Sequence, residues 1–482
     1  ILTNLNNATM PHVLIREDDG NFTLQPLSKE YDEENFWVPR EVGDDNSNPV
    51  PTFVNKPIRD VFFFMNRLGI LSEDTVILSQ AGDYFNFFQG SAIAISDADP
   101  IDLAASSTRP SSLKAAIGTP AGLLIFAQNS QFLMSTEDVA FGPSTVKMTE
   151  ITNYSYDSEV EPVETGVSVL FCTSAATYSK VFELSTDSLQ ARALVSENTR
   201  IVPEYIPPNL TTLTSVPNSS MILMGNGDNI LYTFKFYNTG NERNLAGWTK
   251  WIMPTNIQMT AFDHDTGYIV GHNSTGQTIL SRMELLDDPE TSPIQAFDRK
   301  FTPRLDHYLF SEQVTVENQG KRSKVYVPSG FLTEEAKPYL VATFEGSETF
   351  FTSGEFSSDV GGDFVMVDTA ILDSDFILGL GYTMSITLPS FFVKSGEQNR
   401  ADRRFPPIVE NVYLELYYSG RYEVLIKRKG YIDRSVELGV IDADVYLAND
   451  AAIDYFSTKA IPVYSQGDLA LLTITAEDPL PA

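Results

Sequence analysis

Histidines and acidic residues are the side chains of this sequence that come nearest to a metal-binding or acid–base site. The four histidines are His12, His264, His272 and His307. The sequence Asp263-His264-Asp265, followed by His272, brings together carboxylates and imidazoles, which are ligands that zinc accepts. The histidines lack the one-turn helical spacing of a zinc-protease motif, however, and residues 263–267 are typical of a turn between strands. We therefore expect a turn here and no metal site.

The sequence has one cysteine, Cys172, which excludes an intrachain disulfide and a cysteine-based zinc site. Cys172 lies in the apolar run Ser168-Val-Leu-Phe-Cys-Thr173, which is typical of a strand. No histidine or basic residue stands near it in the sequence to activate the thiol as a nucleophile. We predict a buried and unreactive thiol.

No motif of a known catalytic or cofactor-binding loop is complete. The chain has no Gly-x-Ser-x-Gly elbow and no Walker loop, and Gly379-Leu-Gly381 lacks the third glycine of a dinucleotide-binding loop. Residues 225–229 lack the distal glutamate of a calcium loop and are better interpreted as a hairpin turn. Paired carboxylates stay open as an alternative, because 64 acidic residues always place some pairs close together. We predict no catalytic residue, no cofactor and no metal, and thus no enzyme.

The chain is strongly acidic. It has 33 lysine and arginine residues against 64 aspartate and glutamate residues, which gives a formal net charge of −31. Nucleic-acid phosphates and anionic lipid surfaces repel such a chain, so sequence-specific DNA binding is not expected. The longest apolar stretches, such as residues 121–127, are too short to span a membrane. The chain begins at Ile1 with no signal-peptide pattern, and we expect a cut or processed N-terminus.

Short apolar runs separated by clusters of Asp, Gly, Asn, Ser and Pro recur along the first part of the chain and predict β-hairpins. We expect hairpins over residues 13–24, 61–78, 123–134, 169–184, 221–234 and 268–280, the second turning at residues 66–69. Their intervals of roughly 40 to 60 residues suit the four-stranded blades of a β-propeller. The fold class is therefore all-β and propeller-like, and a large β-sandwich made of the same hairpins is the alternative.

After about residue 300 the predicted strands become longer, so we divide the chain into a propeller-like domain, 1–300, and a β-rich domain, 301–482. In the second domain, residues 412–418 and 422–426 flank Ser419-Gly420 and are predicted to pair as one hairpin. Residues 394–434 contain nine lysines or arginines and six acidic residues, so this stretch carries about +3 in a chain of −31.

Several longer stretches carry a specific resemblance and follow one another in a fixed order. They are Met10-Pro-His12, Pro57-Ile-Arg-Asp-Val-Phe-Phe-Phe-Met-Asn-Arg-Leu-Gly69, Leu78-Ser-Gln-Ala-Gly-Asp-Tyr-Phe-Asn-Phe-Phe88, Asp99-Pro-Ile-Asp102 and Leu124-Ile-Phe-Ala-Gln-Asn-Ser-Gln-Phe132. This succession resembles the tail tubular protein B, or nozzle, family of short-tailed bacteriophages. The resemblance covers most of residues 7–300 and the rest more loosely. Chains of this family usually carry a further N-terminal region before the Met-Pro-His motif.

The resemblance implies a structural virion protein of the tail tip, placed below the portal and adaptor rings. Members of the family have a propeller-like β core, form hexamers, close and open the DNA channel and help to hold the tail fibres. The implied partners are further copies of this chain in a homohexamer, the tail adaptor protein, the tail fibre protein, and viral DNA that passes through the lumen without specific binding. The alternative is a propeller-type receptor-binding or polysaccharide-degrading tail protein.

Two groups of residues are the candidate sites. The motif residues Arg59, Asp60, Asn66 and Arg67 form the first group. Arg59, Asp60 and Arg67 flank the aromatic run 62–64, and we expect them to form buried or interblade ion pairs in a structural role, with ligand binding as the alternative. The basic residues Arg400, Arg403, Arg404, Lys427, Arg428 and Lys429 are expected to contact a neighbouring subunit or a fibre, because arginine forks suit carboxylate partners. A solvated loop or a DNA guide in the lumen are the alternatives for this second group.

Overall fold

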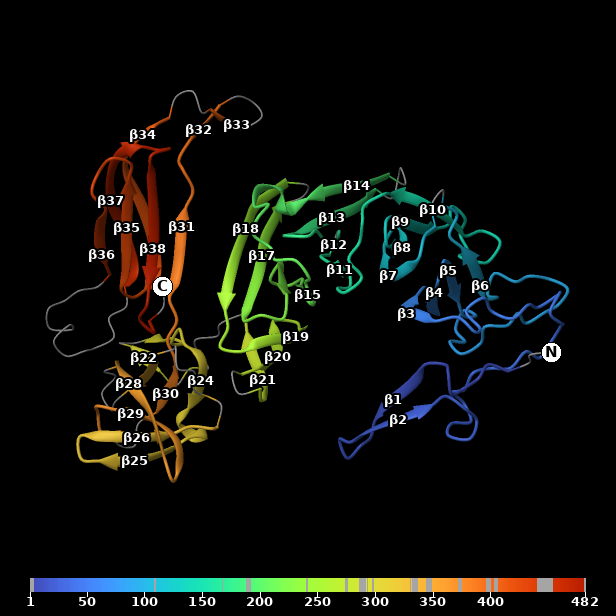
Figure 1. Ribbon diagram of the computed structural model, residues 1–482, viewed down its shortest axis with the longest axis horizontal. Coiled ribbons are helices and arrows are strands. Elements are labelled where there is room, and N and C mark those ends of the chain that lie inside the picture. The colour runs from blue at the N-terminus through green and yellow to red at the C-terminus, as the bar shows by residue number, and fades with distance from the viewer. Residues whose placement is uncertain are drawn as a thin grey trace. The chain divides into compact units, whose positions relative to one another are not determined.

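The computed structural model describes residues 4–107, 110–166, 168–187, 192–239, 242–273, 276–285, 292, 294–296, 299–329, 331, 337–343, 349–371, 375–395, 400–402, 406–439 and 454–480. These residues form β-strands and connecting segments, with two short 3-10 helices, η1 (Asn198–Ile201) and η3 (Ser311–Gln313). The chain divides into two compact units, Ile1–Leu285 (unit 1) and Leu286–Ala482 (unit 2), each described by itself (Figure 1). The boundary predicted at 300/301 lies shortly after this division and stays a prediction.

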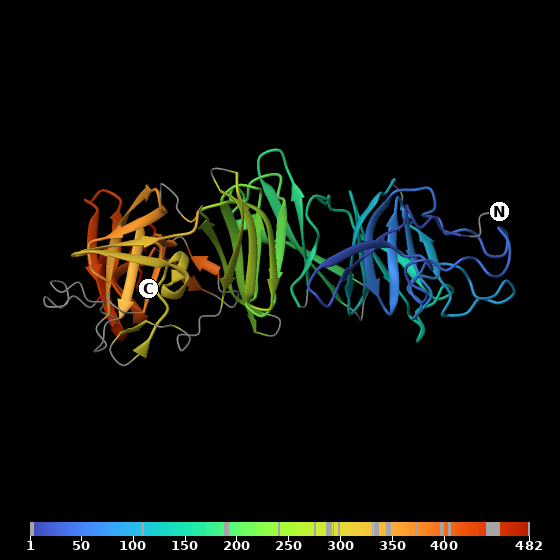
Figure 2. The same cartoon turned by 90° about the horizontal axis from the view of Figure 1, so that it is seen from below.

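Unit 1 is a series of antiparallel sheets, each built from strands that follow one another in the chain (Figures 1 and 2). Sheet 1 consists of β3 (Ile58–Phe64), β4 (Arg67–Ser72), β5 (Thr75–Leu78) and β6 (Ile101–Ala104). Sheet 2 consists of β7 (Leu113–Thr119), β8 (Gly122–Ala127), β9 (Gln131–Ser135) and β10 (Lys147–Thr152). Sheet 3 consists of β11 (Val163–Glu164), β12 (Val169–Ser174), β13 (Ser179–Asp187) and β14 (Arg192–Glu197).

Sheets 4 and 5 continue this series. Sheet 4 consists of β15 (Thr212–Val216), β16 (Met221–Gly225), β17 (Ile230–Thr239) and β18 (Glu242–Ile252). Sheet 5 consists of β19 (Asn256–Asp263), β20 (Thr266–His272) and β21 (Thr278–Glu284). A separate hairpin of β1 (His12–Arg16) and β2 (Phe22–Pro26) precedes sheet 1. Five of the six hairpins predicted from the sequence are present. In the second, residues 61–64 pair with β4, and residues 76–78 form β5 on the other side of β4.

The turn between β3 and β4 shows how these short strands reverse direction. Met65 and Asn66 have positive φ angles of 46° and 57°, and Phe64 pairs directly with Arg67, so two residues form the turn. The sequence predicts this turn at residues 66–69, but Arg67 already begins β4. Gly69 pairs with Phe62, whose ring covers it so closely that a Cβ on Gly69 would lie 2.3 Å from ring carbons.

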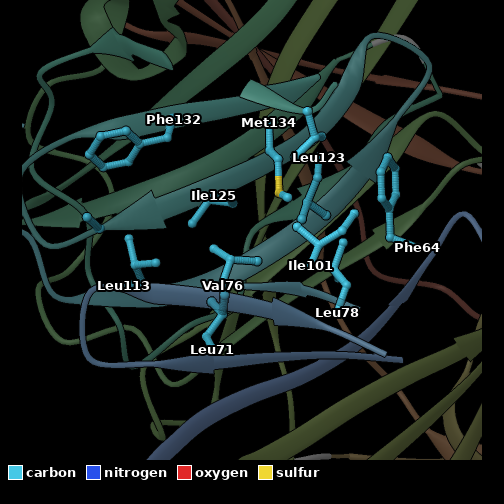
Figure 3. Packing of buried hydrophobic residues seen from close by; sticks show 12 residues of the cluster. Phe64, Leu71, Val76, Leu78, Ile101, Leu113, Leu123, Ile125, Phe132 and Met134 are labelled. Carbon is cyan, nitrogen blue, oxygen red and sulfur yellow. The ribbon is translucent and has the colours of Figure 1, made fainter. Parts of the chain in front are cut away.

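The sheets of unit 1 pack face to face in the order of the sequence. The core between sheets 1 and 2 includes Phe64, Leu71, Val76, Leu78, Ile101, Leu113, Leu123, Ile125, Phe132 and Met134 (Figure 3). Further buried clusters join sheet 2 to sheet 3, sheet 3 to sheet 4, and sheet 4 to sheet 5. Four-stranded antiparallel sheets that share cores through their faces are the blades of a propeller. The predicted all-β, propeller-like fold is confirmed.

The outer face of sheet 1 is covered by the residues around it in the chain rather than by another sheet. Trp37, Phe53, Phe87 and Phe88 pack there with Leu68 and Ile70 of β4. The rings of Trp37 and Phe85 meet edge to face at 5.5 Å, and those of Phe53 and Phe87 at 5.3 Å. The aromatic residues of the run 84–88 are therefore part of this core.

Unit 2 begins with a seven-stranded antiparallel sheet whose strand order is β24-β30-β27-β28-β29-β26-β25. Its strands are β24 (Asp306–Phe310), β25 (Thr315–Gln319), β26 (Arg322–Tyr326), β27 (Pro338–Thr343), β28 (Thr349–Asp359), β29 (Gly362–Val367) and β30 (Phe376–Leu380). The first half of β28 pairs with β27 and its second half with β29, so this long strand joins the two parts of the sheet. The small ladders β22 (Gln295–Ala296) with β23 (Arg299–Lys300) and β32 (Val393–Ser395) with β33 (Arg400–Asp402) are separate.

A β-sandwich forms the rest of unit 2. One layer has the order β31-β38-β35-β36 and the other is the long ribbon β34-β37. The strands are β31 (Met384–Leu388), β34 (Ile408–Ser419), β35 (Tyr422–Arg428), β36 (Arg434–Leu438), β37 (Asp454–Gln466) and β38 (Ala470–Ala476). Apolar residues of both layers share one core, for example Val424 and Ile426 with Ile461 and Val463.

The hairpin predicted from residues 412–418 and 422–426 is wrong in its pairing. Both strands exist, but β34 pairs with β37, whereas β35 pairs with β36 and β38. The intervening Gly420 carries the chain from one layer to the other. A Cβ on Gly420 would lie 2.5 Å from the Cβ of Leu480, so only glycine fits this crossing without a shift.

Candidate functional site

The guanidinium of Arg67 lies inside unit 1, with 2% of the residue exposed. It donates hydrogen bonds to the backbone carbonyl oxygens of Ser79 (2.7 Å), Asp97 (2.6 Å), Ala98 (3.2 Å), Asp99 (2.8 Å) and Phe141 (3.4 Å). These oxygens belong to segments outside the strands, so Arg67 supplies donors that the sheet ladders do not. One side chain thereby holds the connection between β5 and β6 to the connection between β9 and β10.

The ion pair that the sequence predicts for Arg67 is replaced by these carbonyl contacts. The buried carboxylate of Asp99 accepts hydrogen bonds from the backbone N–H groups of Ser96 (2.7 Å) and Gly90 (3.2 Å). Burial lowers the pKa of Arg67, and the negative charge of Asp99 acts in the opposite direction. Arg67 is therefore a charged cross-link of loop backbone, a role that its position beside an aromatic run does not reveal.

Asp60 links sheet 1 to sheet 2. Its Oδ2 accepts a hydrogen bond of 2.9 Å from the backbone N–H of Ala116 in β7. Both ladders are irregular at this point, with register shifts between Ile58 and Asp60 and between Leu113 and Ala115. Burial raises the pKa of the Asp60 carboxyl group. The interblade contact expected for Asp60 is thus a hydrogen bond to backbone and not an ion pair.

Asn66 and Arg59 complete the motif residues. The Oδ1 of Asn66 accepts a hydrogen bond from the hydroxyl of Tyr84 at 2.7 Å, and its carbonyl oxygen accepts one from the N–H of Gly82 at 2.9 Å. Arg59 is exposed on the outer side of β3. The structure therefore brings Asp60, Asn66 and Arg67 into the internal contacts of unit 1, and it leaves Arg59 at the surface.

A second charged link, which sequence reasoning missed, lies between sheets 3 and 4. The guanidinium of Arg243 in β18 forms two hydrogen bonds, of 2.8 and 2.9 Å, to the carboxylate of Glu183 in β13. Ser168 and Asn198 donate to the same carboxylate at 2.7 and 3.0 Å. Burial alone would raise the pKa of Glu183, but the hydrogen bonds outweigh it and the pKa is lowered. No local pattern marks the pair, because its members are sixty residues apart.

Replacing Glu183 with glutamine is expected to lower the free energy of unfolding of unit 1 by about 1–3 kcal/mol at neutral pH. Because the folded pKa lies below the unfolded value near 4.5, the contribution is present above that pH and is lost as the pH falls through the folded pKa. The variant and the parent should therefore converge in acid. Chemical denaturation followed at several pH values measures this. Glu284→Gln, whose carboxylate is 55% exposed, is the control and should change stability by less than about 0.5 kcal/mol.

The basic residues predicted to make contacts are described only in part. Arg400 begins β33, where it pairs with Ser395, and Arg403 and Arg404 lie outside the described residues. Lys427 and Lys429 are exposed at the end of β35, and Arg428 is half-buried with its guanidinium over the ring of Tyr431 at 5.0 Å. The structure thus presents the second basic cluster on the surface of unit 2.

The histidine turn and the cysteine occupy the positions expected from the sequence. His264 has a φ of 56° in the turn between β19 and β20, and its Nδ1 lies 2.7 Å from the carboxylate of Asp263. Cys172 is buried between sheets 3 and 4, and burial raises its pKa to about 12, so the thiol is protonated at neutral pH. In the part of the chain that the structure describes, no three His, Cys, Asp or Glu side chains are grouped closely enough to hold a metal ion.

Comparison with known proteins gives the family. A family model described as bacteriophage nozzle protein matches residues 1–482, the full length of the sequence. The chain belongs to the bacteriophage nozzle protein family. The tail tubular protein gp12 of Escherichia phage T7 is 31% identical to this nozzle protein over 300 residues, which are 60% of this chain and 36% of gp12. The chain therefore spans about a third of the length of the curated relative that it matches.

Family membership makes this nozzle protein a structural component of the phage tail within the virion. The resemblance stated from the Met-Pro-His and Pro57–Gly69 stretches is confirmed by the same match. The alternative of a receptor-binding or polysaccharide-degrading tail protein is not favoured. Among the described residues of the nozzle protein, no helix has the length and hydropathy of a membrane span.

Several solved structures are similar to the nozzle protein at low sequence identity. Kluyveromyces lactis Hsv2p has a TM-score of 0.31 at 9% identity, covering 64% of this chain and 82% of its own. The WD40 domain of Neurospora crassa Pan2 has a TM-score of 0.27 at 11% identity, covering 68% and 91%. The fold of unit 1 therefore rests on its sheets and the cores that they share.

Proposed function

We propose that this chain is a tail nozzle subunit whose copies form a ring that bounds and gates the channel for DNA ejection and helps to anchor the tail fibres. The observation that carries the proposal is the match of the nozzle family over residues 1–482. The packing of unit 1 supports it, because sheets that share continuous cores make a rigid wall. Arg67 and Asp60 strengthen that wall by joining the loops and backbones of neighbouring sheets.

The partners in this proposal are further copies of the chain, six if the family likeness extends to the oligomer, together with the tail adaptor protein and the tail fibre protein. Viral DNA passes through the lumen without specific binding. The net charge of −31 on every subunit supports this, because phosphate groups find few cations to neutralise them along an acidic wall. Because an acidic wall forms few salt-sensitive contacts with phosphate groups, it does not slow the passing genome.

The proposed subunit does no covalent chemistry. Its histidines lack the one-turn helical spacing of a zinc-protease motif, and its one thiol is buried in the core between sheets 3 and 4. The two basic groups of the second domain serve as contacts to a neighbouring subunit or to a fibre in this proposal. These are Arg400, Arg403 and Arg404 in the first group and Lys427, Arg428 and Lys429 in the second.

The function is tested by imaging tails assembled with a labelled copy of this chain. We expect density for several symmetry-related copies around the tail axis, surrounding the DNA path. Tails that assemble and eject DNA with no copy of the chain on the axis would contradict the proposal. Incubation of the purified protein with host polysaccharide provides the second arm, in which release of oligosaccharides would favour the polysaccharide-degrading alternative.

A further inference from the structure

The turn between β35 and β36 is a concentrated positive surface in an acidic chain. We call residues 427–434 the basic turn. It contains four cations and one acid, namely Lys427, Arg428, Lys429, Arg434 and Asp433. Asp468 lies on the neighbouring turn, whose Leu469 carbonyl accepts a hydrogen bond from the N–H of Lys429. Lys427, Lys429 and Arg434 are exposed, and within the described residues none of them forms an ion pair. Their charges are thus available to another molecule.

The basic turn also presents an apolar tip. Gly430 has a φ of 85°, and the N–H of Tyr431 donates to the carbonyl of Arg428, so the backbone is a tight and defined turn. The guanidinium of Arg428 covers the ring of Tyr431 at 5.0 Å and orients it. Tyr431 is nevertheless 68% exposed, and Ile432 is 90% exposed. Two large apolar side chains between cations are the composition of a binding anchor.

The outer face of the β34-β37 ribbon has the complementary character. Its inner side chains pack into the sandwich core, and its outer side carries Ile408, Tyr413 and Tyr464, which are 72%, 65% and 65% exposed. Glu410 and Glu415 are exposed on the same side, and neither has an ion-pair partner among the described residues. We call these five residues the acidic face. It offers carboxylates and apolar contact area where the basic turn offers cations and an apolar tip.

We propose that the basic turn of one copy docks on the acidic face of the next copy. The two surfaces match in charge and in apolar character, and both belong to unit 2 of every chain. A contact that joins one surface of a copy to a different surface of its neighbour is heterologous, and it closes into a ring when the rotation between copies allows. The inference rests on the proposed ring of nozzle subunits and assigns one of its contacts.

An anionic lipid surface is the other class of partner that a basic turn with an apolar tip can meet. The acidic face favours a second copy of this chain as the partner. Its exposed apolar residues can contact Tyr431 and Ile432, and its carboxylates can pair with the lysines of the basic turn. A lipid surface leaves the three exposed apolar residues of the acidic face without a partner. The experiments below separate the two.

Disulfide cross-linking in assembled tails tests the contact directly, because the chain has a single, buried cysteine and engineered cysteines give a clean background. The full chain carrying Ile432→Cys and Tyr413→Cys is expected to form chain-to-chain multimers on oxidation. The matched control carries Ile432→Cys and Ile93→Cys, since Ile93 is 98% exposed in unit 1. The first pair should cross-link on the order of tenfold more than the control. Equal cross-linking of the two pairs would overturn the assignment.

Charge exchange tests whether the two surfaces recognise each other. Lys427→Glu with Lys429→Glu, or Glu410→Lys with Glu415→Lys, should each reduce the copies incorporated per tail by about tenfold or more. The chain with all four substitutions should regain incorporation, because attraction returns with the signs exchanged. Lys147→Glu with Lys321→Glu, two exposed lysines elsewhere, changes the net charge equally and should leave incorporation unchanged.

The remaining outcomes separate this inference from the proposed function. If either pair of substitutions is incorporated as well as the parent, the proposed contact is contradicted, and the proposed ring is not. If the fourfold exchange fails to recover, and the lysine exchange abolishes flotation with phosphatidylglycerol vesicles, the partner is a lipid surface and the inference falls. If the parent chain is absent from the tail axis, the proposed function falls and the inference falls with it.

Discussion

Replacing Arg67 with methionine is expected to lower the free energy of unfolding of unit 1 by about 3 kcal/mol or more. Methionine keeps much of the side-chain volume but removes every donor to the carbonyl oxygens of Ser79, Asp97 and Asp99. Each buried carbonyl left without a partner costs about 1–3 kcal/mol. The negative charge of Asp99, which is 3% exposed, also loses its nearby cation. The loss thus exceeds that of an ordinary surface ion pair.

Tryptophan fluorescence during chemical denaturation measures this loss, because all three tryptophans of the chain lie in unit 1. Arg59→Met is the matched control, since Arg59 lies on the adjacent strand but is exposed. It should shift the free energy of unfolding by no more than about 0.5 kcal/mol. Equal unfolding midpoints for Arg67→Met and the parent would contradict the role assigned to the guanidinium.

The sequence predicts the strands of this protein better than it predicts what its charged residues do. Alternating apolar residues and turn clusters locate hairpins such as β8 with β9, because register and turn chemistry are local. Arg67 is different. Its partners are loop carbonyls at residues 97–99 and 141, and a carbonyl is present at every position of any sequence. From the sequence, Arg67 is a cation beside an aromatic run. Only the fold shows that it donates to backbone carbonyl oxygens and not to a carboxylate.

The same distinction explains why the sequence wrongly predicts that β34 and β35 pair as a hairpin. Ser419-Gly420 between two apolar strands is a turn signal, and the local pattern does not tell a hairpin from a crossing between layers. The partners of these strands, β37 and β38, come later in the chain. At this crossing Leu480 packs so closely against Gly420 that a Cβ on residue 420 would lie 2.5 Å from the Cβ of Leu480. Long-range packing decided what a local signal left open.

The segment at residues 478–480 gives the second large expected effect. It lies between the sandwich and the seven-stranded sheet of unit 2. Leu480 is 5% exposed and packs with Val341 of β27 and Ile377 of β30 in the seven-stranded sheet, and with Phe301, which precedes that sheet. The carbonyl of Pro479 accepts a hydrogen bond of 2.8 Å from the N–H of Arg304. The segment therefore fastens the two parts of unit 2 together.

Replacing Leu480 with alanine should destabilise unit 2 by about 2–5 kcal/mol, the usual range for emptying a buried leucine site. Hydrogen exchange of β30 and β31 reports it, because those strands lie in the two parts that the segment joins. Leu471→Ala is the control: Leu471 is 41% exposed on β38, and its loss should cost well under half as much. Equal exchange rates in both variants would show that Leu480 does not hold the two parts.

The neighbouring ion pair distinguishes an apolar fastening from an electrostatic one. Asp478 accepts hydrogen bonds of 2.9 and 3.2 Å from the guanidinium of Arg421, whose side chain is 41% exposed. Water still screens such a pair, so Asp478→Asn should cost only about 1 kcal/mol. The apolar contact of Leu480 excludes water from the same junction and depends little on salt. If Asp478→Asn proved as damaging as Leu480→Ala, and only at low salt, charge and not packing would hold the sandwich to the sheet.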